Sequence, residues 1–229
     1  MNRTPIHSRK FFLTLLAALA AQLAMAVAHA QAVSHPNVNA QLLIAARQSD
    51  VARAERLLSE GAAPNSRNRL GKTALLLACE KGDLGLADLM LRRGAEIGMA
   101  SLEGVTPLMA ASYSGNADLV KRLLSAGART DPVDRMHKPA IVYAAGQGHA
   151  GAVDALLASG IDVNATYEHR LTLLMWAAGQ GHPDVVKLLL ARGAQAELRD
   201  DRGLTALDIA RLSQHEQAAA LLDRTPGPR

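Results

Sequence analysis

The chain has 229 residues, of which 49% are hydrophobic and only 3% are aromatic. Alanine and leucine supply most of the apolar mass, which favours many short, closely packed helices over a sandwich or barrel of bulky strands. Three of the 25 Lys and Arg residues precede residue 31 and all 21 acidic residues follow it, so the net charge of +4 falls to +1 beyond residue 30. No basic stretch remains there that would favour binding to a nucleic acid or to an anionic membrane.

Residues 1–30 are predicted to be a cleavable export signal. A basic start precedes an apolar run over residues 11–27, and Ala28-His29-Ala30 fits the small-x-small pattern that places cleavage before Gln31. An uncleaved membrane anchor is the alternative, disfavoured because the run is rich in alanine and a cleavage site follows at once. Ser8-Arg9-Lys10 resembles a twin-arginine leader with lysine in the second position, so the general secretory route is favoured. We expect a periplasmic protein, with secretion from the cell as the alternative.

Cys79 is the only cysteine of the chain, so an intrachain disulfide is excluded. A reactive thiol or an intermolecular bridge is one interpretation. A buried, small apolar residue is the favoured one, because Cys79 lies within an apolar helical segment.

Three sets of residues recur every 33 positions, which is the signature of a repeat protein. The first set is Gly61, Gly94, Gly127, Gly160 and Gly193, the second is Gly82, Gly115, Gly148 and Gly181, and the third is Thr73, Thr106, Pro139, Thr172 and Thr205. Within one period, Val120, Leu123 and Leu124 have the i, i+3, i+4 spacing of an apolar stripe on a helix. Glycines that follow each helix suit the left-handed conformation that ends helices. The sequence therefore predicts an array of helix pairs.

The third repeat carries the residues that point to a family. Its pattern Thr106-Pro107-Leu108, Ala110-Ala111, Gly115, Val120, Leu123-Leu124 and Gly127-Ala128 resembles the ankyrin repeat. The resemblance implies an all-α solenoid of about six helix-turn-helix units joined by short hairpin fingers, with a concave face of fingers and inner helices that binds partner proteins. The chain also looks like the small periplasmic ankyrin proteins of proteobacteria.

The repeat pattern divides the chain into a signal peptide (1–30), a linker (31–39), an ankyrin repeat domain (40–223) and a flexible tail (224–229). The expected units are 40–66, 67–99, 100–132, 133–165, 166–198 and 199–223. Polar residues in the last unit suit a terminal repeat, on which nothing stacks. We expect the protein to be a monomer by itself.

No residue pattern favours catalysis, a cofactor or a metal site. The sequence lacks the nucleophile elbow, the Walker loop, the zinc-protease helix and paired cysteines. Glycine-rich steps recur at the repeat period, so they are predicted to be turns. The resemblance implies a structural hydrogen-bonding role for His149 and His182, whereas His137 and His169 on fingers could approach one another. We expect a protein that is not an enzyme.

The family's finger and inner-helix positions, carried over residue by residue, give a predicted partner-binding surface. Its residues are Arg69, Lys72, Glu103, Tyr113, Arg135, Met136, Lys138, Tyr167, Glu168, His169, Trp176, Gln180 and Arg202. Tyr113, Tyr143, Tyr167 and Trp176 all lie in repeats three to five, and Tyr and Trp are enriched at binding hot spots. Tyr143 and Trp176 share one repeat position, so packing between inner helices is an equal alternative for these two.

Two finger tips depart from the pattern. His137 and Arg170 stand where Gly71, Gly104 and Gly203 mark the tips of the other fingers. A non-glycine residue in a left-handed turn costs about 1–2 kcal/mol. Either these fingers adopt another conformation, or binding compensates for the strain, or the repeats are simply degenerate here.

The function predicted from these features is a protein-binding scaffold or accessory module that acts through the groove and fingers of repeats three to five. The alternatives are an immunity or inhibitor protein that neutralises a toxin, and a secreted effector that binds a host protein.

Overall fold

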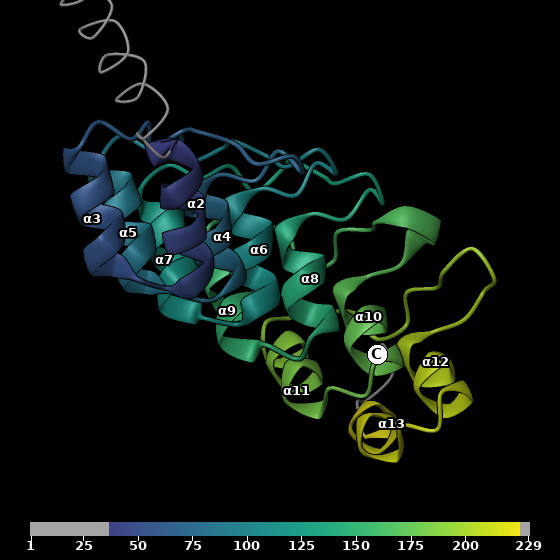
Figure 1. The fold of residues 1–229 in the computed structure, drawn as a ribbon. Helices are drawn as coiled ribbons and strands as arrows, with labels where there is room; N and C mark the ends of the chain where they lie inside the picture. Colours follow the sequence, from purple (N-terminus) through teal and green to yellow (C-terminus); the bar gives the residue numbers. More distant parts are fainter. Residues whose placement is uncertain (1–36, 225–229) are drawn as a thin grey trace, which may run out of the picture.

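The computed structural model describes residues 37–224, and Figure 1 shows their course. The predicted signal peptide at 1–30, the linker up to residue 36 and the tail from residue 225 lie outside the described residues. Within 37–224 there are twelve α-helices in six helix-turn-helix pairs, and extended pairing is limited to one bridge between Thr166 and Thr172. The predicted all-α solenoid is therefore confirmed.

The helices form two layers that follow the chain from one end of the array to the other (Figure 1). The first helices of the pairs contact one another in succession and form the inner layer: α2 (Val38–Gln48), α4 (Ala74–Glu80), α6 (Pro107–Ser114), α8 (Ala140–Gly146), α10 (Leu173–Gly179) and α12 (Ala206–Leu212). The second helices form the outer layer: α3 (Val51–Ser59), α5 (Leu84–Arg92), α7 (Ala117–Ser125), α9 (Ala150–Leu157), α11 (Pro183–Ala191) and α13 (Glu216–Asp223). A short 3-10 turn, η1 (Glu168–Arg170), precedes α10. From Asn37 to Arg224, no helix has both the length and the apolar character needed to cross a bilayer.

The inner helices begin where the repeat places a threonine. The hydroxyl oxygens of Thr73, Thr106, Thr172 and Thr205 each accept a hydrogen bond from the backbone N–H three residues later. Such a cap satisfies one of the N–H groups that a helix start leaves unpaired. Pro139 occupies this position in the fourth repeat and supplies no side-chain cap, so α8 starts without one.

The core runs between the two layers and is built from small and aliphatic side chains. Ala110 and Ala111 are buried on α6, which lets neighbouring inner helices approach closely. Leu119, Val120 and Leu123 of α7 are buried as the predicted apolar stripe. Each helix pair leaves an apolar side that only the next pair covers, which is why the array is stable as a stack.

Cys79 is fully buried on α4. Burial in this apolar environment, with Glu80 beside it, raises the pKa of the thiol far above its ordinary range. Burial therefore disfavours the reactive thiolate, and the interpretation of Cys79 as a buried, small apolar residue is confirmed.

The second glycine set is required by the neighbouring repeat as well as by the backbone. Gly115 has φ +81, and a Cβ there would lie only 2.4 Å from Nδ1 of His149. The His149 ring lies on this glycine, with Nε2 3.0 Å from the carbonyl oxygen of Tyr113. His182 repeats the contact at Gly148 and at the carbonyl oxygen of Gly146. Both histidines therefore link successive repeats, as the resemblance implied.

Candidate functional site: the finger row and the inner-helix face

Four of the five fingers between successive helix pairs are organised by one short polar side chain. In the fourth finger, the Oδ1 atom of Asp134 accepts hydrogen bonds from the backbone N–H groups of Met136 and Lys138, both at 2.9 Å. The hydroxyl of Tyr143 on α8 donates to the other carboxylate oxygen. Asn68, Ser101 and Asp200 hold the second, third and sixth fingers in the same way. The acceptor lies three residues before the tip and fixes a tight turn.

Neighbouring fingers are joined by backbone hydrogen bonds at matching positions, with one interruption. The bonds run from Leu102 N–H to Leu70 O (2.9 Å), from Arg135 N–H to Glu103 O (3.0 Å) and from Asp201 N–H to His169 O (3.1 Å). The corresponding pair between the fourth and fifth fingers, Glu168 N–H and Met136 O, forms no such bond among the described residues. The finger row is therefore continuous through fingers two to four and again through fingers five and six, and it is open between them.

The fifth finger differs because Tyr167 stands at the position of the organising acceptor. Without a short oxygen-bearing side chain to hold the tip, the chain forms η1 and the bridge between Thr166 and Thr172. His169 and Arg170 are both left-handed, each with φ 57. The fifth finger therefore adopts a conformation different from that of the other fingers, which is one of the alternatives expected for the irregular tips.

The fourth finger keeps the regular turn although its tip is not glycine. His137 is left-handed, with φ 53, and its N–H donates to the carbonyl oxygen of Asp134 just as Gly104 donates to that of Ser101. The hydrogen bonds to Asp134 therefore hold His137 in a conformation that disfavours a side chain.

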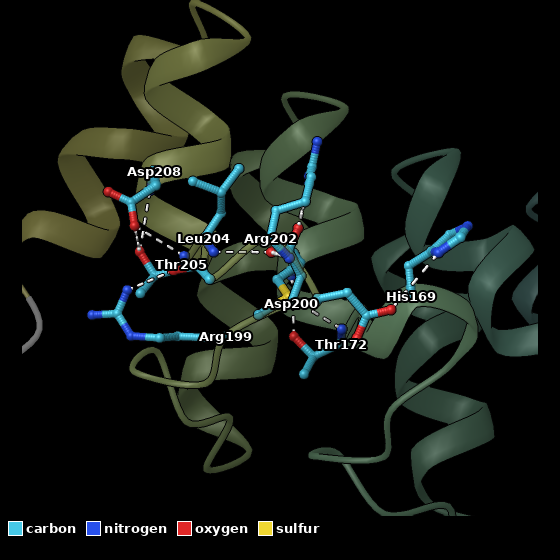
Figure 2. A network of polar contacts seen from close by, with 11 residues as sticks. His169, Thr172, Arg199, Asp200, Arg202, Leu204, Thr205 and Asp208 are labelled. Atoms are coloured by element: carbon cyan, nitrogen blue, oxygen red, sulfur yellow. Dashed lines mark hydrogen bonds and ion pairs between the residues drawn. The ribbon is translucent and has the colours of Figure 1, made fainter.

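The fifth and sixth fingers meet through a polar network, shown in Figure 2. Asp200 receives bonds from the backbone of Arg202 and Leu204 and from the Arg202 guanidinium at 2.7 Å. Burial opposes ionisation of Asp200, but these bonds together outweigh it and hold the pKa of the carboxyl below its ordinary value. His169 Nδ1 lies 3.8 Å from an Asp201 carboxylate oxygen. Within residues 37–224, no three His, Cys, Asp or Glu side chains gather as a metal site.

Two aromatic side chains of the inner helices each pack beside a residue of the preceding inner helix. Tyr143 packs edge-to-face against Tyr113, with ring centroids 6.1 Å apart. Trp176, at the equivalent position one repeat later, lies beside Gly146, where a Cβ would be 4.0 Å from its Cε3 atom. Gly146 thus leaves room for an indole where Tyr113 leaves room for a phenol. Tyr143 and Trp176 are half-buried and pack against the core, whereas Tyr113 remains 54% exposed.

Two cavities open on this face and share Tyr143 as a wall. The first, of about 290 Å³, is lined by Glu80, Val105, Met109, Ala110, Tyr113 and Tyr143. The second, of about 140 Å³, is lined by Lys138, Val142, Tyr143, Gly146, Gln147, Trp176 and Gln180. The first is lined by residues of the second, third and fourth repeats, and the second lies between the fourth and fifth repeats.

The predicted binding residues all lie on the fingers or the inner helices, but they differ in exposure. The exposed ones are Arg69, Glu103, Tyr113, Arg135, Met136, Glu168, His169, Gln180 and Arg202. The half-buried ones are Lys72, Lys138, Tyr167 and Trp176. Burial, with Asp162 nearby, raises the pKa of Tyr167 to about 12, so its phenol is more enclosed than a finger-tip contact residue would be.

Charges are balanced over the described residues, which hold 21 Lys and Arg and 21 Asp and Glu, but they are not evenly paired. Lys72 pairs with Glu80 at 2.6 Å. Among the other finger cations, Arg69, Arg135, Lys138 and Arg170 have no carboxylate within ion-pair distance in residues 37–224. Glu103 and Glu168 have no cation within that distance in the same residues. The fingers therefore present unneutralised charge of both signs, with cations in excess.

The residues that hold the fingers in shape, and part of the lining of the first cavity, were not identified from the sequence. Asp134 was not singled out, although Asn68, Ser101, Asp134 and Asp200 recur at or near the repeat spacing and are all short side chains that accept hydrogen bonds. Met109 was noted only as part of the repeat pattern and not as a cavity wall. The spacing alone could have identified the organising position.

A family model described as "Ankyrin repeats (3 copies)" matches residues 42–134, 76–167 and 141–227, which together cover residues 42–227. The resemblance drawn from the repeat pattern is therefore confirmed. No curated protein gives a significant match to the chain.

Proposed function

Since the chain belongs to the ankyrin repeat family, whose members typically bind other proteins and catalyse no reaction, we propose that it is a periplasmic binding scaffold. It holds another protein on the finger row and inner-helix face of repeats three to five, and stabilises, inhibits or positions that partner. The partner is a protein, and the scaffold is a monomer when alone.

The observation that carries this proposal is the set of exposed apolar side chains on the third and fourth fingers and on α6, where Tyr113 lines the first cavity. Tyr113 is 54% exposed, and Leu102 and Met136 on the adjacent fingers are each 59% exposed. Large apolar side chains on a rigid support, beside a concave apolar cavity, are the usual centre of a protein interface. The balanced net charge and the mixture of signs on the fingers favour a protein over a polyanion.

The location rests on residues 1–30 alone. Their basic start, apolar run and Ala28-His29-Ala30 step support export and cleavage before Gln31. The predicted location and cleavage are tested separately by looking for the protein in a periplasmic fraction and in the culture medium and by determining its mass.

Site-directed photo-crosslinking tests the binding face. A photoreactive phenylalanine derivative replaces Tyr113 in one variant and Lys121, which is exposed on the outer helix α7, in the control. We expect a specific cross-linked partner from position 113 and none from position 121. Cross-links from position 121 but not from position 113 would place the interface on the outer helices and contradict the proposal.

A combined substitution then measures the contribution of the face. Tyr113→Ala, Arg135→Ala and Met136→Ser alter exposed side chains, whereas Tyr167 is left unchanged because it is half-buried. We expect partner binding to weaken at least about tenfold, since hot-spot truncations cost about 2 kcal/mol or more. The thermal midpoint should remain within a few degrees of that of the parent protein. Unchanged affinity would remove repeats three to five as the binding site.

A further inference from the structure

The second cavity, of about 140 Å³ between the fourth and fifth repeats, differs chemically from the first. Lys138 comes from the fourth finger, Tyr143 from α8, and Trp176 and Gln180 from α10 and its end. The fourth finger and the inner helices α8 and α10 thus all contribute to the walls of this cavity.

Lys138 brings to this cavity an ammonium group that has no acceptor within the described part of the chain, and the side chains of Gln147 and Gln180 also line it. The Nζ atom of Lys138 lies 4.9 Å from the centroid of the Trp176 ring and has no carboxylate or other acceptor in residues 37–224. Nε1 of Trp176 is the one buried side-chain polar atom among the described residues that has no hydrogen-bond partner. An ammonium group can only donate, so the group that complements Lys138 at this cavity is an acceptor, and an ionised carboxylate also carries the opposite charge.

The lining of the neighbouring first cavity favours an apolar group. Val105, Met109 and Ala110 line it together with Tyr113 and Tyr143, and Glu80, which also lines it, is already paired with Lys72. Because Tyr143 is a wall of both cavities, a ligand that fills both carries its apolar group and its carboxylate on the same side and close together. In an extended peptide, side chains at i and i+2 lie on one side about 6.5–7 Å apart.

We propose, on the basis of the function proposed above, that the two cavities bind an extended acidic segment of the partner protein. An aliphatic side chain enters the cavity walled by Tyr113 and Tyr143. The Asp or Glu two residues away places its carboxylate against Lys138, above Trp176. Arg135, exposed and without an ion-pair partner on the same finger, adds to the positive potential that attracts the segment.

A single-stranded nucleic acid also offers anions and rings that stack on tryptophan. The fingers favour the peptide, because Glu103 and Glu168 are exposed and unpaired on either side of Lys138 along the finger row. A polyanion would meet these carboxylates, whereas a peptide with one or two acidic residues avoids them.

The single tryptophan provides a direct readout, since its indole N–H gives one signal for the whole protein. The probe is acetyl-Gly-Leu-Ser-Glu-Gly-amide, and the matched control replaces its Glu by Gln. In ¹H–¹⁵N spectra we expect the acidic peptide to shift the Trp176 indole signal saturably. The Gln peptide should bind roughly three- to tenfold more weakly, and the difference should shrink at high salt.

Three variants separate charge from packing. Lys138→Gln should reduce the affinity for the Glu peptide about three- to tenfold and remove its preference over the Gln peptide, whereas Lys138→Arg should retain the preference. Lys121→Gln, the same change on the outer helix α7, should have no effect on either peptide.

Equal binding of both peptides, no movement of the Trp176 signal, or tighter binding of an oligothymidylate would overturn this inference. The scaffold proposal would stand through any of these results if position 113 still cross-links a protein. Failure of the cross-link from Tyr113 together with unchanged affinity of the combined variant would instead remove the proposed function.

Discussion

The fourth and fifth fingers depart from the repeat pattern at the same position but have different structures. Each lacks the tip glycine, with His137 in one and Arg170 in the other, and both residues are left-handed. The fourth keeps the regular turn because Asp134 holds two N–H groups of the tip, whereas Tyr167 offers the fifth no such acceptor. The comparison shows that the acceptor three residues before the tip, more than the glycine at the tip, determines the finger's shape.

The largest expected effect comes from removing that acceptor where it is present. Asp134 is buried, and Asp134→Leu leaves the N–H groups of Met136 and Lys138 and the hydroxyl of Tyr143 without their partner. We expect the free energy of unfolding, measured by urea titration, to fall by about 2–3 kcal/mol. Asp134→Asn is the control, since Asn68 fills the same position in the second finger. If the Leu variant were as stable as the Asn variant, the acceptor would not organise the finger.

Acid should destabilise both the sixth finger and the helix α12 that follows it. Hydrogen bonds from Thr205 lower the pKa of Asp208, and those from Leu204 and Arg202 outweigh burial to lower that of Asp200. A lowered folded-state pKa stabilises the fold above the unfolded value of about 3.9, and this contribution is lost as the pH falls through the folded-state values. We expect stability to decline below about pH 4, and the decline to be shallower in an Asp200→Asn, Asp208→Asn double variant. Urea titrations across this range provide the test, and identical slopes would contradict it.

A smaller effect of opposite sign is expected at the fourth tip. His137→Gly removes the strain of a left-handed residue with a side chain, about 1–2 kcal/mol, but adds freedom to the unfolded chain. The net expectation is an increase of about 0.5–1 kcal/mol in the free energy of unfolding by urea titration. Gly104→Ala in the third finger is the reverse control, and its Cβ would also lie 3.1 Å from the backbone of Asp134. A less stable His137→Gly protein would show that the imidazole itself contributes contacts.

The repeat period made the architecture predictable, whereas the fingers depend on single residues that the period does not determine. The glycine and threonine sets identify helix pairs because local backbone rules act alike in every repeat. The partial burial of Tyr143 and of Trp176 depends on the residue that the preceding inner helix places beside each of them, Tyr113 in one case and Gly146 in the other. The interruption of the finger row follows from Tyr167. Its effect can be recognised only by comparing this finger with the four fingers that have an acceptor at the same position.

The smallest change in stability, and the sharpest test of the comparison, is expected from Tyr167→Asp. The substitution loses a half-buried ring but supplies the acceptor for the N–H groups of His169 and Leu171, so the net free energy should change by less than about 1 kcal/mol. The finger should then adopt the regular turn and bring Glu168 N–H to the carbonyl oxygen of Met136. Amide hydrogen exchange should show protection of Glu168 in the Asp variant and none in Tyr167→Phe, which keeps the ring without the acceptor. Continued fast exchange in the Asp variant would mean that the left-handed pair at the tip, and not residue 167, separates the two halves of the finger row.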